Sequence, residues 1–99
     1  MSNTQTPPDF LVHDEADTVG VIVVETVNAN HEINGWMMSN DDNLAMMAKS
    51  DIPLGHKIAL NDIQAGDAII KYGHDIGKAI SPIAKGEHVH VHNVKTKRW

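Results

Sequence analysis

Histidine is the residue type in this sequence with the greatest capacity for chemistry, because seven histidines occur in 99 residues. Three of them, His88, His90 and His92, alternate with Val89 and Val91. Alternate residues of a β-strand share one face, so we expect the three imidazoles on one side of a strand and the two valines on the other. Imidazole nitrogens bind zinc, iron, copper and nickel. The spacing therefore predicts metal ligands, and a solvated strand face that carries histidine is the alternative.

Two short segments place basic side chains beside glycine. His56 and Lys57 directly follow a glycine, and Lys71 and Tyr72 directly precede one. A glycine turn lets a ligand approach the backbone closely, so a histidine and a lysine beside it can meet an anion. The hydroxyl of Tyr72 can donate a hydrogen bond from an otherwise apolar setting. The alternatives are a surface turn with a solvated lysine and a tyrosine that is simply packed.

An acidic loop follows the first apolar segment. His13 is followed by Asp14, Glu15 and, after one alanine, Asp17. Carboxylate oxygens at this spacing can bind a hard cation or orient the histidine ring. An acidic turn between two strands would have the same composition.

Short strands joined by tight turns are the elements predicted to position these side chains. Residues 19–24 are mostly β-branched and residues 10–13 form a shorter apolar run, so both are predicted strands. Residues 41–49 fit a short helix about as well as a strand, and residues 59–63 fit a single helical turn. We expect mostly β structure.

A faint internal repeat supports that expectation. Four segments of similar form each carry asparagine or glycine at a turn position, at Asn30, Gly55, Gly66 and Gly86. These residue types tolerate a left-handed backbone conformation, so each position is predicted to be a tight turn that leads into a new strand.

Composition limits the classes of function. Apolar residues make up 41% of the chain, as in an ordinary globular domain, and the net charge of −5 argues against general binding to nucleic acid. The absence of cysteine excludes disulfides and thiolate chemistry on this chain. No apolar run approaches the roughly 20 residues of a membrane helix, and the polar start lacks the regions of a signal peptide. We therefore expect a cytoplasmic protein with no nucleic-acid or membrane partner.

Three segments together resemble the altronate and galactarate dehydratase family. Residues 52–63, IPLGHKIALNDI, are similar to that family's Ile-Pro-x-Gly-His-Lys-x-Ala-Leu-x-Asp-Ile segment. Residues 70–77 resemble its Ile-Lys-Tyr-Gly-x-x-Ile-Gly segment, and residues 86–93 resemble the Gly-Glu-x-Val-His-x-His-Asn ending of the altronate branch. A fourth segment, the loop at residues 13–19, resembles the family's His-x-x-Asp-Asn-Val but has one extra residue and Thr18 in place of asparagine.

The resemblance implies a fold and a partner. In that family this region is a SAF domain with a beta-clip fold, fused to or paired with a large catalytic portion. We therefore expect a mostly β SAF domain over residues 9–94, a disordered tail over residues 1–8 and a basic tail over residues 95–99. The resemblance also implies a small subunit that acts with a large catalytic (beta) subunit, and self-association of the isolated chain is a further expectation.

An activity is implied as well. Residues 10–15 and 94–99 are most similar to a branch of two-subunit lyases that split a sulfonated hydroxy acid into pyruvate and sulfite, and altronate dehydratase is the alternative. Either reaction implies a small anionic hydroxy acid as substrate and a divalent metal, iron(II) by resemblance, with most of its ligands on the large subunit. A SAF module that binds a ligand without catalysis is the alternative from another class.

Nine residues receive expected roles on this basis. The catalytic centre is expected to contain His13, His56 and Lys57. Substrate contacts are expected from Lys71, Tyr72 and Asn93, and metal contacts on this chain from His88, His90 and His92.

Overall fold

The computed structural model describes residues 7–96, and this part of the chain consists of strands and turns without a helix. In chain order the strands are β1 (Phe10–Val12), β2 (Val19–Ile22), β3 (Thr26–Val27), β4 (Glu32–Met37), β5 (Asp42–Met47), β6 (Ile52–Pro53), β7 (Lys57–Ala59), β8 (Ala68–Lys71), β9 (His74–Ala79), β10 (His88–Val89) and β11 (Val94–Thr96). The prediction of a mostly β domain is confirmed. No described segment is a helix that could cross a membrane.

Two local predictions are decided by these bounds. Residues 41–49 contain the strand β5 and no helix. Residues 59–63 contain a bend and a one-residue bridge from Ile63 to Ile83, so the predicted helical turn is wrong. In both places pairing with a partner strand outweighs a weak local preference for helix.

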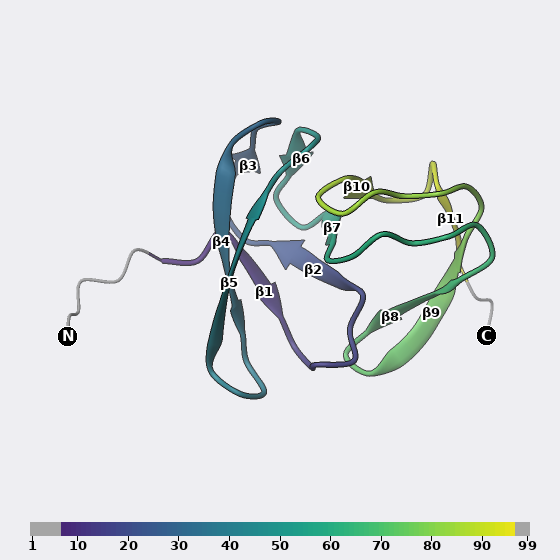
Figure 1. Cartoon of the computed structure of the whole chain (residues 1–99), viewed down its shortest axis with the longest axis horizontal. Coiled ribbons are helices and arrows are strands. Elements are labelled where there is room, and N and C mark those ends of the chain that lie inside the picture. The colour runs from purple at the N-terminus through teal and green to yellow at the C-terminus, as the bar shows by residue number, and fades with distance from the viewer. Residues whose placement is uncertain (1–6, 97–99) are drawn as a thin grey trace.

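Three sheets organise the strands (Figure 1). The largest has six strands in the order β10-β7-β2-β1-β4-β5, the second has the order β11-β9-β8, and the third pairs β3 with β6. Neighbours in the six-stranded sheet are antiparallel except β1 and β4, which are parallel. In Figure 1, β4 and β5 lie on the left, β8, β9 and β11 on the right, and β7 and β10 between them. Strands β7 and β10 therefore lie in the middle of this view, with four predicted site residues in or next to them: His56, Lys57, His88 and His90.

The described residues bury two hydrophobic clusters on opposite faces of the largest sheet. The first contains Phe10, Ile22 and Ile58, and the second contains Ala59 and Val89 with residues of the three-stranded sheet. Consecutive residues of a strand face opposite sides, so Ile58 enters one cluster and Ala59 enters the other. Both are fully buried. The backbone of β7 is thus held from both faces, which fixes the residues at its start.

Phe10 explains two of the glycines. A Cβ atom added at Gly35 would lie 2.2 Å from the Phe10 ring, and one added at Gly20 would lie 2.8 Å from it. Gly35 pairs with Phe10 across β1 and β4. The ring of Phe10 therefore covers backbone that has no room for a side chain.

The four predicted turn positions all adopt a positive φ. The angle is 69° at Asn30, 85° at Gly55, 92° at Gly66 and 91° at Gly86, so the predicted left-handed turns are confirmed. The domain boundary expected at residue 94 falls inside β11, because Lys95 and Thr96 continue that strand against β9. Residues 1–6 of the expected N-terminal tail and residues 97–99 of the basic tail lie outside the described residues.

Candidate functional site

The pairing of β7 with β10 brings two distant histidines together. The antiparallel register places Ile58 opposite His88 and Lys57 opposite Val89. One further step in this register puts His56, which precedes β7, opposite His90, which follows β10. Residues directly opposite in an antiparallel pair have close Cβ atoms. The His56 and His90 rings accordingly stack with centroids 3.9 Å apart and planes 19° from parallel.

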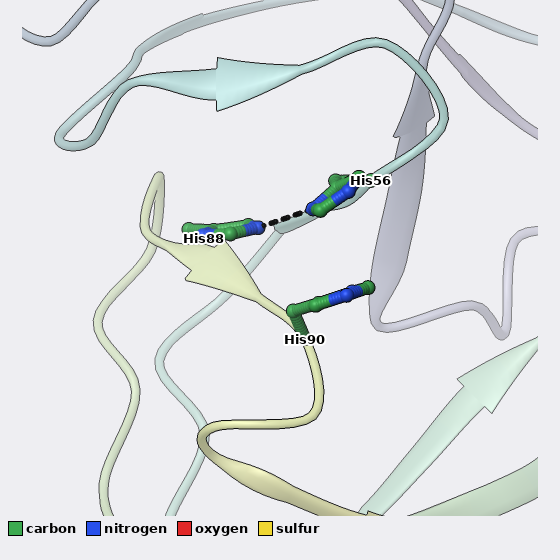
Figure 2. Close-up of side chains that lie close together, drawn as sticks. All are labelled: His56, His88 and His90. Carbon is green, nitrogen blue, oxygen red and sulfur yellow. Dashed lines mark hydrogen bonds between the residues drawn. The ribbon is translucent and has the colours of Figure 1, made fainter.

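His88 completes a cluster of three imidazoles, which Figure 2 shows. A hydrogen bond of 2.8 Å joins His56 Nδ1 to His88 Nε2, and one of these two nitrogens donates its proton to the other. The His88 and His90 rings are 11° from parallel, with centroids 5.6 Å apart. Each of the three histidines offers one nitrogen within 4.8 Å of the others. The three half-buried side chains form what we call the histidine cluster, His56, His88 and His90.

The predicted continuous strand through residues 88–92 is wrong. Strand β10 ends at Val89, which is fully buried, whereas residues 91–93 form a turn and Val91 is 70% exposed. The chain turns here because it must pass into β11, the edge of the other sheet. His92 therefore leaves the predicted face. Its ring lies 5.0 Å from that of His88 and is tilted by 43°, and the nitrogen set within 4.8 Å contains His56 in its place.

Asn93 holds this turn in place. Its side-chain oxygen accepts a hydrogen bond from the His90 backbone N–H at 2.9 Å, and its Nδ2 donates to the His88 carbonyl at 2.8 Å. The residue is 9% exposed. Its amide thus fixes the backbone at both ends of the His88–His90 segment.

Lysine side chains continue the site from the histidine cluster. Burial lowers the pKa of Lys57, and the nearby charge of Lys71 lowers that pKa further. Lys57 and His90 line one cavity of about 100 Å³, and Lys71 and Tyr72 line another of about 100 Å³. A third cavity, of about 420 Å³, lies at β9 and β11 and has none of the predicted site residues in its lining. Each of the two smaller cavities places a lysine beside an imidazole, Lys57 with His90 in one and Lys71 with His13 in the other.

The far end of the site is formed by His13 and Tyr72. Their rings meet edge to face with centroids 4.4 Å apart, and Lys71 Nζ lies 5.0 Å from the centre of the Tyr72 ring. Tyr72 has a φ of 55° in the turn between β8 and β9, and its side chain is 53% exposed rather than packed.

Asp17 links the acidic loop to that turn. Its carboxylate accepts hydrogen bonds from the Gly73 N–H at 2.8 Å and from the Asp14 N–H at 3.2 Å. The residue is 5% exposed. The buried carboxylate is engaged by two backbone donors, so it ties the acidic loop to the turn that carries Tyr72.

Two groups of side chains make up what we call the basic strip. Ring contacts and the lysine over the Tyr72 ring join His13, Tyr72 and Lys71, and ring contacts join His90, His56, His88 and His92. Lys57 relates the two groups by its charge: Lys71 lowers the pKa of Lys57, Lys57 lowers the pKa of His90, and Lys57 and His90 line one cavity. Burial is the largest influence that lowers the pKa of His88 and of His90, and the neighbouring imidazoles lower both further. The charge of Lys57 adds to the lowering of the His90 pKa. The strip therefore combines lysines that attract anions with imidazoles that favour the neutral form.

Sequence comparison decides the family. The model of the altronate/galactarate dehydratase SAF domain matches residues 8–97. The chain belongs to this family. The mostly β SAF domain expected from the resemblance is confirmed, and the match begins and ends close to the described residues.

Two kinds of relative match this chain: short proteins that it covers almost completely, and a much longer enzyme of which it covers a small part. The (2R)-sulfolactate sulfo-lyase subunit alpha of Chromohalobacter salexigens is 53% identical over 91 residues, which cover 92% of this chain and 97% of that protein. The protein of the same name in Paracoccus pantotrophus is 52% identical over 61 residues, 62% of this chain and 91% of its own length. Altronate dehydratase of Bacillus subtilis is 53% identical over 53 residues, which cover 54% of this chain but 11% of that enzyme.

Proposed function

We propose that this chain is the small subunit of a two-subunit lyase that splits (2R)-3-sulfolactate into pyruvate and sulfite. The observation that carries the proposal is the basic strip, on a chain that aligns with a sulfolactate sulfo-lyase alpha subunit over nearly the full length of both. The substrate has two anionic groups, a carboxylate and a sulfonate. Two neighbouring lysines, Lys57 and Lys71, are matched to such a dianion because each can bind one of them.

The proposed reaction removes the proton from the carbon next to the carboxylate. The carbon–sulfur bond then breaks, its electron pair leaves with sulfite, and the resulting enol becomes pyruvate. A base of moderate pKa suits the first step. We assign it to His13, which lies beside Tyr72 at the lysine end of the strip. Tyr72, whose side chain is exposed there, is assigned a hydrogen bond to the substrate.

A second chain is needed to enclose the substrate. The cavities along the strip are about 100 Å³ each, whereas small-molecule sites usually measure 300–1,000 Å³. Altronate dehydratase carries the matching segment as 11% of a much longer chain. We therefore propose that a large catalytic subunit covers the basic strip and supplies the rest of the pocket.

The expected divalent metal, iron(II) by family resemblance, can be tested against the donors present. Among the described residues, the group that fits a metal ion is the histidine cluster, which offers three imidazoles and no carboxylate. Imidazole is a suitable donor for iron(II) and for zinc. A metal that holds the carboxylate and hydroxyl of the substrate would stabilise the negative charge that develops during proton removal.

The test is purification of the tagged chain with its large partner and an assay of sulfite release from (2R)-3-sulfolactate. We expect Lys57→Met to lower kcat/KM by about 10- to 100-fold, because one charged hydrogen bond to the substrate is lost. Lys85→Met is the matched control, since Lys85 is an exposed lysine that lines neither of the two cavities of the strip, and it should leave the rate unchanged.

The alternatives give different results in this experiment. A complex that dehydrates altronate and releases no sulfite would keep the family and replace the substrate. A chain that captures no large subunit and shows neither activity would contradict the proposal and favour a SAF module that binds without catalysis. A cytoplasmic location stays a prediction of the sequence.

A further inference from the structure

The cavity at the lysine end of the basic strip has a side to which the proposed reaction assigns no role. His13, Lys71 and Tyr72 line one part of this cavity, and four apolar side chains line another. We call these four the apolar wall: Leu11, Val21, Val23 and Met38. We propose that the apolar wall selects the substrate, because it admits a short hydroxy acid and disfavours a polyhydroxylated one. This inference rests on the proposed function and adds the residues that determine its specificity.

Strand register places the four side chains of the wall on one face of the largest sheet. Leu11 of β1 lies directly opposite Val21 of β2. Leu11 also lies directly opposite Trp36 of β4. Alternate residues of an extended chain share a face, so Val23 continues the face of Val21 and Met38 continues the face of Trp36. The wall is therefore a surface built across three neighbouring strands.

Val23 and Met38 lie just beyond the ends of β2 and β4, and backbone hydrogen bonds still hold them beside β1. The Val23 N–H donates to the Asp9 carbonyl at 3.0 Å, and the Met38 N–H donates to the Val12 carbonyl at 2.8 Å. The side chain of Val23 is 40% exposed and that of Met38 is 44% exposed. Val19, further along the same face, is buried in the cluster formed with the three-stranded sheet. The wall thus begins where cover by that sheet ends, and it is open to a ligand.

The hydrogen-bonding groups of the cavity are gathered away from the wall. His13, Lys71 and Tyr72 supply an imidazole, an ammonium and a hydroxyl group. The carboxylate of Asp17 also lines the cavity, but it already accepts hydrogen bonds from two backbone N–H groups. The side chains of the wall carry no N–H or O–H group. A polar group of a ligand that reaches the wall therefore loses water and gains no hydrogen bond.

The two candidate substrates differ in the groups that they bring to the wall. In 3-sulfolactate the hydroxyl and both anionic groups sit on a chain of three carbons, so the polar end of the site can meet them together. Altronate carries further hydroxyls along a chain of six carbons. In a cavity of about 100 Å³ these hydroxyls come into contact with the wall. Since an apolar pocket rejects an added hydroxyl by roughly 100-fold, we expect discrimination of at least this order.

The experiment compares the two acids in the complex of the full chain with its large partner. KM is measured for (2R)-3-sulfolactate from sulfite release, and Ki is measured for altronate as an inhibitor of that release. The ratio of Ki to KM should be at least about 100 for the wild type. Met38→Gln and Leu11→Asn keep the approximate size of each side chain and add hydrogen-bonding groups. Each should lower the ratio by about 10-fold, because a hydroxyl of altronate gains a partner.

Met47→Gln is the matched control, because Met47 is also an exposed methionine, at 50%, and does not line the cavity. Its ratio should stay within about twofold of the wild type. Circular dichroism and thermal unfolding establish that each variant is folded. Unchanged ratios in both wall variants, in a complex that releases sulfite, would contradict this inference and leave the proposed function intact. A wild-type complex that dehydrates altronate and releases no sulfite would contradict both.

Discussion

Replacement of Asn93 by alanine tests whether this residue maintains the site or contacts the substrate. The side chain makes two hydrogen bonds to backbone, one from the His90 N–H and one to the His88 carbonyl, in a place where the residue is 9% exposed. Each bond contributes about 1 kcal/mol net, and the backbone groups left without a partner would be poorly solvated. The predicted loss is therefore about 2 kcal/mol in the free energy of unfolding.

That loss should lower Tm by about 8–16 °C, since 1 kcal/mol shifts the midpoint by about 4–8 °C in a domain of this size. The measurement is thermal unfolding of the full chain followed by circular dichroism. Asn28→Ala, at an exposed asparagine, is the matched control and should change Tm by no more than about 2 °C.

The opposite pattern would refute this reasoning. If Asn93→Ala unfolds at the wild-type temperature, its two hydrogen bonds do not maintain the turn. If such a variant then loses activity in the complex, the role expected from the family resemblance, contact with the substrate, would be the correct one.

Three further predictions concern the scaffold and the charges of the strip. Gly35→Ala should lower the free energy of unfolding by about 1–3 kcal/mol in a denaturant titration, because the new methyl group overlaps the Phe10 ring. Adding Phe10→Leu to the same chain should recover part of that loss. Lys57→Met should raise Tm at pH 7, because the lowered pKa of Lys57 means that its positive charge is less favourable in the folded than in the unfolded chain. The difference in Tm between variant and wild type should shrink as the pH rises toward 10.5, the ordinary pKa of lysine, where the charge is lost in both states. Equal Tm values at pH 7 would contradict a destabilising charge at Lys57. Asp17→Ala should accelerate hydrogen exchange at the Gly73 amide, which loses its acceptor, and unchanged protection there would exclude the proposed link between loop and turn.

Much of the local structure follows from the sequence for simple reasons. Residues such as Asn30 and Gly86 can adopt a positive φ at little cost, so their turns can be predicted without knowledge of the fold. The β-branched run at residues 19–24 likewise favours a strand wherever it is placed. The family motifs at residues 52–63 and 86–93 identified the two segments that turn out to be paired.

The composition of the histidine cluster depended on tertiary structure. A regular alternation of histidines and valines predicts one strand face, but β10 stops at Val89 because the chain there must cross to the other sheet. His56 is far from His88 in sequence, and only the antiparallel register of β7 and β10 places it beside His90. Pairing between distant segments is set by the packing of both sheets, so local pattern does not determine it.

The same division holds at the other end of the strip. The sequence alone shows that His13 lies in an acidic loop and that Tyr72 lies at a glycine turn, and it shows no link between them. The buried carboxylate of Asp17 makes that link through the Gly73 N–H. The sequence by itself thus determined which residues can do chemistry and where the chain turns, because both depend on local residue type. Which of those residues lie side by side in the basic strip was determined by strand register and by hydrogen bonds between distant segments.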